Sequence, residues 1–275
     1  MPRHTPHETV PETAHEASTA APGVPRRAVL PEEMTAVKAL VFDVFGTVVD
    51  WRGGVARQSA QFLRRHAPAV DPYDFADRWR AEYQPAMERV RSGERPFVRL
   101  DELHRENLDR VLAGLGTDPD AVAVAERDEL NLVWHRLDPW PDVIAGLHSL
   151  RERYIIAPLS NANVRLALDM AKRAGLPWDA ILGAEVVQSY KPAPETYLRT
   201  VDILGLEPSQ VAMVAAHNDD LAAARACGLR TVFVPRRTEH GPRQDTDLEA
   251  ESDWEIVAEG FGELARTLGA GGSGI

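Results

Sequence analysis

The chain alternates between short apolar runs and amphipathic stretches, most of which end at glycine. The apolar runs, rich in β-branched residues, are 38–44, 153–160, 181–186, 211–216 and 230–235. The helical patterns between them are 140–153, 164–175, 194–205 and 219–228. Strands and helices that alternate at this spacing form a parallel sheet covered by helices on both faces. The sequence therefore predicts an α/β, Rossmann-like core.

The interval 53–138 breaks this alternation, because it contains helical patterns and no convincing strand. We interpret it as an α-helical cap domain inserted between the first and second strands. The core would then consist of 36–52 and 139–266. Because the insertion follows the carboxyl end of the first strand, where α/β proteins carry their chemistry, it is expected to act as a lid. The helical patterns are 54–67, 72–93, 98–116 and 121–137.

Both ends of the chain differ from this pattern in composition. Residues 1–35 are rich in Pro, Thr, Ala, His and Glu, and 267–275 are rich in glycine, so both are expected to be flexible tails. The first tail has neither the apolar run of a signal peptide nor a transit-peptide pattern. With a net charge of −11, the chain is a poor candidate for nucleic-acid or membrane-surface binding. We expect a cytoplasmic protein.

Polar residues follow the first two predicted strands. Asp43 ends the first apolar run, and Thr47 lies in the turn after it. Ser160 and Asn161 end the second run. Each group alone is also typical of an ordinary turn or cap. At the carboxyl end of a strand, however, such groups could equally carry a nucleophile and an anion site.

The next two strand ends carry a cation and acids. Lys191, one of only three lysines, lies between the third strand and the following helix, where it could orient the Asp43 carboxylate. His217 and Asp220 follow the fourth strand. Acids in the first turn of a helix are common because they complement its dipole, so this group also has a purely structural interpretation.

The order of these groups carries more information than any one of them. The segments FDVFGTVVD, PLSNAN, YKPAPETY and MVAAHNDDLAAARACGLRT resemble the haloacid dehalogenase superfamily over roughly residues 38–260. The helical insertion is similar to the cap that this superfamily places after its first strand. The resemblance implies Asp43 as a carboxylate nucleophile, with Lys191 and Asp220 paired beside it.

The first motif discriminates between two chemistries of the superfamily. Its phosphatases use a second Asp, two residues after the nucleophile, to protonate the leaving group, and bind Mg²⁺ partly through a Gly-Asp pair after the fourth strand. Here these positions are Phe45 and Ala215-Ala216. The sequence more closely resembles the type II 2-haloacid dehalogenases, in which a halide leaves without a proton donor. No metal or other cofactor is implied.

The resemblance also implies roles for individual residues. Asp43 would displace halide from a short 2-haloacid, and water would then hydrolyse the resulting ester. Lys191, Thr47 and Ser160 would orient the Asp43 oxygens and the substrate carboxylate. The halide or substrate would meet Asn161, Phe45, Tyr197 and Arg80, an arginine of the cap. Trp79, Tyr83 and Met87 lie on the same predicted helix face as a stripe typical of cap core.

One departure from the type II pattern concerns the hydrolytic step. Where those enzymes have Ser-Ser-Asn-x-x-Asp, this chain has Ala215 to Asp220, with His217 in place of Asn. We expect His217 to position or activate the hydrolytic water, because a neutral imidazole can accept a proton. A Mg²⁺-dependent phosphatase and a non-catalytic binding module remain alternatives. The substrate, the halogen range including fluoride, and the oligomeric state stay open, although relatives are often homodimers.

Overall fold

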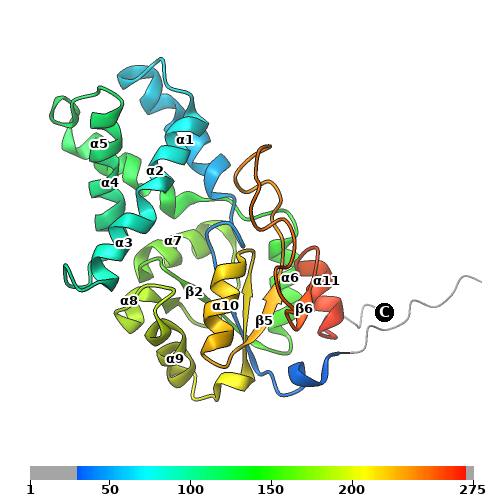
Figure 1. Ribbon diagram of the computed structural model, residues 1–275. Coiled ribbons are helices and arrows are strands. Elements are labelled where there is room, and N and C mark those ends of the chain that lie inside the picture. The colour runs from blue at the N-terminus through cyan, green and yellow to red at the C-terminus, as the bar shows by residue number, and fades with distance from the viewer. Residues whose placement is uncertain (1–29, 271–275) are drawn as a thin grey trace, which may run out of the picture.

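The protein is a six-stranded parallel sheet covered on both faces by helices, with a separate group of helices above one edge of the sheet (Figure 1). The computed structural model describes residues 30–270. The strand order is β3-β2-β1-β4-β5-β6. The strands are β1 Ala39–Phe42, β2 Ile155–Ser160, β3 Leu182–Gly183, β4 Val211–Ala215, β5 Arg230–Phe233 and β6 Ile256–Val257. The core helices are α6 Val143–Arg151, α7 Val164–Ala174, α8 Ala184–Val187, α9 Pro194–Ile203, α10 Asn218–Ala226 and α11 Phe261–Thr267.

Strand β1 lies at the centre of the sheet and sends alternate side chains into two hydrophobic cores, as the pleat of a strand requires. Leu40 and Phe42 pack with residues of α6 and α11, and the Phe42 ring stacks 5.6 Å from that of Phe261. Ala39 and Val41 pack on the other face, with residues of α9 and α10. Helices therefore cover both faces, and the predicted α/β class with a Rossmann-like parallel sheet is confirmed.

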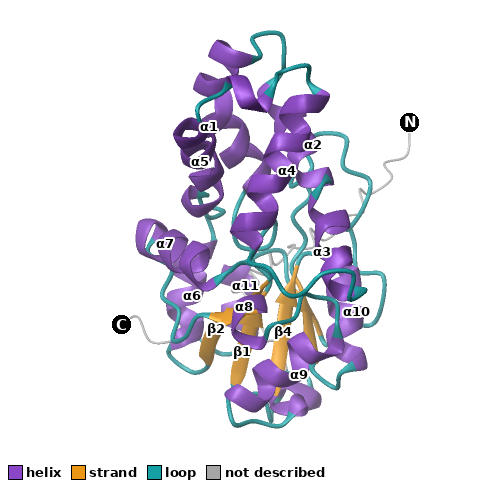
Figure 2. Cartoon of the chain, turned by 90° about the vertical axis from the view of Figure 1, so that its left-hand side faces the viewer, coloured by secondary structure: helices purple, strands orange, loops and turns teal. Residues whose placement is uncertain are grey.

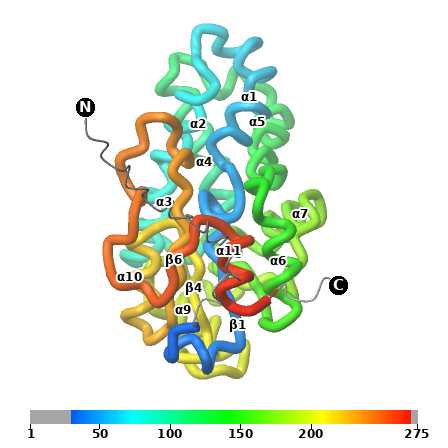
Figure 3. Tube along the Cα trace, turned by 90° about the vertical axis from the view of Figure 1, so that its right-hand side faces the viewer, coloured from blue at the N-terminus to red at the C-terminus, as the bar shows by residue number. Residues whose placement is uncertain are grey.

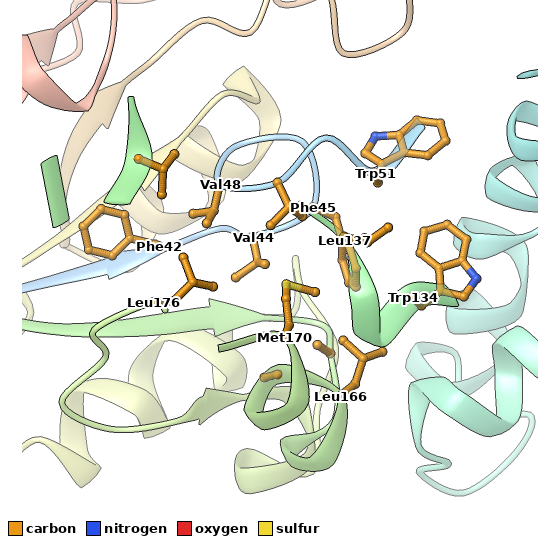
Figure 4. Packing of buried hydrophobic residues seen from close by; sticks show 14 of the residues in the cluster. Phe42, Val44, Phe45, Val48, Trp51, Trp134, Leu137, Leu166, Met170 and Leu176 are labelled. Atoms are coloured by element: carbon orange, nitrogen blue, oxygen red, sulfur yellow. The ribbon is translucent and has the colours of Figure 1, made fainter. Parts of the chain in front are cut away.

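The cap enters after β1 and returns before β2, and it stands above the carboxyl ends of the strands (Figure 2). It begins at Asp50, whose carboxylate accepts the Gly53 N–H and thereby caps the first helix. An aromatic cluster lies at the junction between the cap and β1, where the Trp134 ring contacts those of Trp51 and Trp79. Figure 4 shows Trp51 and Trp134 of this cluster. The cap helices are α1 Trp51–His66, α2 Pro72–Ala81, α3 Tyr83–Arg91, α4 Leu100–Gly114 and α5 Val124–Asn131, followed by the 3₁₀ turn Leu132–Arg136.

Two cap patterns were predicted as single helices and are each divided in the structure. The pattern 72–93 is broken between Ala81 and Tyr83. Pro85 explains this break, because proline lacks the N–H that would bond the Ala81 carbonyl and its ring clashes with that carbonyl. The pattern 121–137 ends as an α-helix at Asn131 and continues as a 3₁₀ turn.

The predicted strand 181–186 is wrong beyond its first residues. Only Leu182 and Gly183 pair with β2, and the chain then forms the single helical turn α8. Gly183 has φ +133°, and a Cβ on it would lie 2.3 Å from the Ser160 carbonyl oxygen, so the chain can turn here only with glycine at this position. The Glu185 carboxylate accepts the Val164 N–H at 2.8 Å, which holds the turn against α7.

The folded part of the chain includes some residues of both segments that were predicted as tails. The first tail lies mostly outside the described residues, but Glu32–Met34 forms a 3₁₀ turn with Met34 buried. At the other end Leu268 and Ala270 are buried, past the predicted boundary at 266. Strand β6 was not predicted, since two residues in a polar stretch give no periodic signal. The segment between β5 and β6 rises from the sheet to the cap (Figure 3).

His104, on α4, should make the protein less stable in mild acid. The ring is buried among Tyr83, Trp134 and Phe45, and within residues 30–270 neither ring nitrogen has a hydrogen-bond partner. Burial lowers the pKa of His104 to about 3, and Asp101 only partly opposes this. The unfolded chain, whose histidines titrate near 6.5, therefore binds more protons below that pH, and the free energy of unfolding falls.

His104→Phe should remove this pH dependence. Between pH 7 and pH 5, the wild type should lose about 2 kcal/mol more of unfolding free energy than the variant. Urea unfolding at both pH values measures the difference. His148→Gln, at an exposed position, is the matched control and should follow the wild type. An equal loss in His104→Phe and the wild type would contradict the assignment.

Candidate active site

Four loops bring polar side chains together at the carboxyl edge of the sheet, beneath the cap. Asp43 directly follows β1, Asn161 follows β2 and His217 follows β4. Lys191 comes from the loop between α8 and α9. Because β1 pairs in parallel with both β2 and β4, the ends of these three strands are neighbours. Residues far apart in the sequence therefore meet at one point.

Asp43 is buried but richly hydrogen-bonded. One carboxylate oxygen, Oδ1, accepts the Lys191 ammonium at 2.9 Å, and Oδ2 accepts the Thr47 hydroxyl at 2.8 Å. Thr47 in turn accepts the Ala216 N–H at 2.9 Å, which fixes the hydroxyl against the β4 loop. Burial alone would raise the pKa of Asp43, but the charge of Lys191 and the contact with His217 outweigh it and hold the pKa far below its ordinary value. The carboxylate is ionised and oriented, as a nucleophile must be.

Lys191 lies between two carboxylates. Its ammonium bonds Asp43 and also Asp220, the acid in the first turn of α10. The second Asp220 oxygen accepts the Tyr197 hydroxyl at 2.6 Å. Burial would lower the pKa of Lys191, yet the charges of Asp220 and Asp43 raise it above its ordinary value. Lys191 is thus a permanent cation beside the Asp43 oxygens.

His217 bridges Asp43 and a second acid, Glu239. Its Nδ1 lies 3.3 Å from Asp43 Oδ2, and its Nε2 lies 2.8 Å from Glu239 Oε2. Burial opposes protonation of His217, but the two carboxylates prevail and raise its pKa well above the ordinary value. Sequence reasoning missed Glu239, which lies in the irregular segment between β5 and β6. The only available signal was an acid soon after the end of the fifth predicted strand.

The cap contributes a cation and a phenol. The Arg80 guanidinium lies over the Tyr83 ring, 3.9 Å from its centroid, and over those of Trp51 and Phe45 at 5.2 and 5.6 Å. In the described part of the chain, Arg80 Nη1 is buried and has no hydrogen-bond partner. Burial raises the pKa of Tyr83, so its hydroxyl remains a donor. Tyr83, assigned to the cap core by its spacing, is indeed buried but also borders the cavity.

These side chains line a cavity of about 410 Å³, which has room for a small organic molecule. Both the core and the cap contribute to its walls. The predicted residues that line it are Asp43, Arg80, Asn161, Lys191, Tyr197, His217 and Asp220; Tyr83, Glu239, His240 and Asp247 line it as well.

Three predicted residues lie behind the cavity wall. Thr47 is fully buried and reaches the site only through Asp43. Phe45 packs in the aromatic cluster (Figure 4), edge-on to Trp134 with the ring centroids 5.8 Å apart. The Arg80 guanidinium lies over the Phe45 ring. Ser160 has no hydrogen bond to Asp43 within residues 30–270, and its hydroxyl oxygen accepts the Ala162 N–H at 3.1 Å; its predicted contact with the substrate carboxylate stays a prediction. Its observed role is to stabilise the turn after β2.

Comparison with known proteins identifies the family. A model of the haloacid dehalogenase-like hydrolases matches residues 37–228. The chain belongs to this family. A crystal structure of a defluorinating L-2-haloacid dehalogenase is 51% identical, with a TM-score of 0.85, over 87% of this chain and 100% of that one.

More distant relatives of this haloacid dehalogenase-like hydrolase include both chemistries of the family. The (S)-2-haloacid dehalogenase of Xanthobacter autotrophicus is 27% identical over 205 residues, 73% of this chain and 76% of that protein. A phosphoglycolate phosphatase of Chromobacterium violaceum is 30% identical over 206 residues, 72% of this chain and 85% of that protein. The choice between the two chemistries therefore depends on the site residues.

Two further observations describe this hydrolase. Within residues 30–270, no group of three or more His, Cys, Asp and Glu side chains is placed to hold a metal ion. Over the same residues, no helix combines the length and hydrophobicity that a membrane span requires.

Proposed function

We propose that this chain hydrolyses the carbon–halogen bond of short 2-haloalkanoic acids and releases a 2-hydroxy acid and a halide ion. The observation that carries the proposal is an ionised carboxylate, Asp43, held by Lys191 at a cavity that also contains the cap cation Arg80. The resemblance to L-2-haloacid dehalogenases supports the same reaction. The proposed reaction uses no metal or organic cofactor.

In the first half of the reaction, an Asp43 oxygen attacks C2 of the substrate from the side opposite the halogen. A bond forms between this oxygen and C2, and the halide leaves with the bonding electrons. Lys191 keeps the nucleophile ionised, and Thr47 fixes its second oxygen. Arg80, with a buried nitrogen lacking a partner in residues 30–270, would bind the substrate carboxylate or the departing halide together with Asn161.

In the second half, water hydrolyses the ester on Asp43. His217 is placed to take the water proton, because its Nδ1 faces the Asp43 carboxylate. Asp220 is less available as a base, since one oxygen accepts Tyr197 and the other is bonded to Lys191. Because only the first half breaks a bond at C2, its configuration inverts once.

The phosphatase alternative has a similar relative in its favour but lacks a proton donor at the expected position. A phosphate ester leaves as an alkoxide and needs an acid near the nucleophile. Phe45, two residues after Asp43, cannot donate a proton, and its ring packs into the aromatic cluster. A halide leaves as a stable anion and makes no such demand.

Halide release is the measurement that separates these functions. Chloroacetate should yield chloride and glycolate in equal amounts without added metal, and (S)-2-chloropropionate should yield (R)-lactate. Bromoacetate and fluoroacetate extend the series, and fluoride release would match the activity of the defluorinating relative. Strong Mg²⁺-dependent hydrolysis of p-nitrophenyl phosphate with no halide release would favour a phosphatase. The absence of both activities would favour a binding module.

A further inference from the structure

Glu239 occupies a site that is built around its carboxylate. The side chain is 2% exposed, although the residue lies in an irregular loop. Oε1 accepts the Trp51 indole N–H at 2.8 Å, and Oε2 lies 2.8 Å from His217 Nε2. Burial would raise the pKa of Glu239, but the charge of His217 and the hydrogen bonds to its carboxylate lower it. A buried acid that stays ionised is held there by its partners.

The loop that carries the nucleophile makes room for this carboxylate. Gly46, three residues after Asp43, has φ +95°, and a Cβ on it would lie 2.1 Å from Glu239 Oε1. A side chain at position 46 would therefore displace Glu239. Arg236 holds the Glu239 loop in place, because its guanidinium donates to the Thr47 carbonyl at 3.0 Å and to Asp142 at 2.9 Å. The nucleophile loop and the Glu239 loop thus form one packed unit.

The contact with Glu239 determines which way His217 faces. When neutral His217 donates its Nε2–H to Glu239, its Nδ1 carries the lone pair. That nitrogen is the one that lies 3.3 Å from Asp43 Oδ2. The lone pair therefore points to the place where water must attack an ester on Asp43.

We propose that Glu239 is a positioning residue for the hydrolytic half of the reaction, holding His217 with Nδ1 turned toward the Asp43 ester and stabilising the imidazolium formed there. This inference rests on the proposed dehalogenation. Its carboxylate is bonded to Trp51 and His217, so we assign it no direct part in bond making or breaking. It acts through His217.

The proton balance is as follows. The water oxygen bonds to the ester carbon, Cγ of Asp43, while one water proton moves to His217 Nδ1. The bond from Cγ to the ester oxygen then breaks, and that oxygen leaves with the electron pair and takes the proton from Nδ1. The product is the 2-hydroxy acid. Asp43 keeps the oxygen of the water, and the second water proton passes to solvent.

Charge explains why His217 becomes a base only after the ester has formed. In the free enzyme it faces the carboxylates of Asp43 and Glu239, with Lys191 beyond Asp43 and His240 3.6 Å from Glu239 Oε1. Esterification neutralises Asp43 and removes one of the two anions. The pKa of His217 must then fall, so the Nδ1 proton that the ring carries in the free enzyme passes to solvent before the water attacks. Glu239 remains to stabilise the imidazolium that forms again during hydrolysis.

Glu239→Gln should separate the two halves of the reaction. With chloroacetate, the first-turnover release of chloride should stay within about threefold of the wild type. Hydrolysis of the ester should slow by about 10²- to 10³-fold, and one carboxymethyl group per chain should accumulate on Asp43. Rapid-quench chloride measurement and intact-protein mass spectrometry provide the two readouts. Glu249→Gln, at an exposed position of the same loop, is the matched control and should behave as the wild type.

The pH profile supplies a readout that a structural role would not change. Loss of the Glu239 charge lowers the pKa of the His217 imidazolium, so the rising limb of ester hydrolysis should move to lower pH in Glu239→Gln. If this variant does not fold, Glu239→Asp, which keeps the charge but withdraws it from His217, should still slow ester hydrolysis and not chloride release. Wild-type ester hydrolysis in a folded variant, or loss of the first-turnover chloride, would overturn the inference. Absence of chloride release from the wild type would instead overturn the proposed function.

Discussion

Replacement of Asp43 by asparagine should abolish halide release from chloroacetate, with a loss of at least about 10⁴-fold in kcat. The amide is a far weaker nucleophile than the carboxylate. Asp220, the other carboxylate bonded to Lys191, is held by Tyr197 and Lys191 and does not take its place. The variant should still fold, because the buried ammonium of Lys191 retains Asp220 as its partner. Chloride release and thermal unfolding, measured on the same preparation, test both parts of this prediction.

A control variant tests whether the effect is specific to Asp43, and a labelling experiment tests whether Asp43 acts as a nucleophile or as a general base. Asp202→Asn, the same change at an exposed position, should leave activity unaltered. In heavy-oxygen water, a single turnover of the wild type should label Asp43 rather than the hydroxy acid, because the product oxygen comes from the carboxylate. Label in the product of that first turnover would show direct attack by water. In that case Asp43 would not carry the ester.

The sequence predicted the residues around the nucleophile because the topology of the sheet determines which loops lie side by side. A parallel sheet places successive strand ends at one edge, so Asp43 and Lys191 could be paired across 148 positions, and the structure has this contact at 2.9 Å. The same argument correctly brought Asp220 and His217 to this edge. Their roles in the reaction stay predictions until the variants are measured.

The residues that sequence reasoning missed or misplaced lie where periodicity carries no information. Glu239 is one acid in an irregular, acid-rich loop, and only the fold shows that Gly46 and Trp51 form its site. Tyr83 sits on a helix face typical of core packing, and one face can both pack and border a cavity. Ser160 sits at a strand end as expected, and the sequence did not show that its hydroxyl oxygen also accepts an N–H of the following turn.

The division of the cap helices illustrates a different limit. Pro85 could have shown that the pattern 72–93 contains a break, because an interior proline removes a helical hydrogen bond. The helical periodicity continues across this break and conceals it. The position of the break matters for the site: Arg80 lies in the last turn of α2 and Tyr83 begins α3, so the break separates two of the cap residues that border the cavity.

His217→Ala should stop the reaction after halide release. The change removes the imidazole whose Nδ1 lies 3.3 Å from Asp43 Oδ2. Asp220 is poorly placed to replace it as a base, because its oxygens are bonded to Tyr197 and Lys191. The first-turnover release of chloride should persist, while ester hydrolysis slows by about 10²- to 10⁴-fold. Intact-protein mass spectrometry should then find the substrate carbon skeleton on Asp43.

Rescue by added imidazole would show that the missing group is a base. Removal of the His217 side chain leaves space beside a cavity of about 410 Å³, so imidazole should enter and accelerate hydrolysis of the ester adduct. The acceleration should increase with pH, since only the neutral ring accepts a proton. His148→Ala, at an exposed position, is the control and should accumulate no adduct. Normal turnover of His217→Ala without an adduct would move the base function to another group, and Asp220 would be the first to test by substitution.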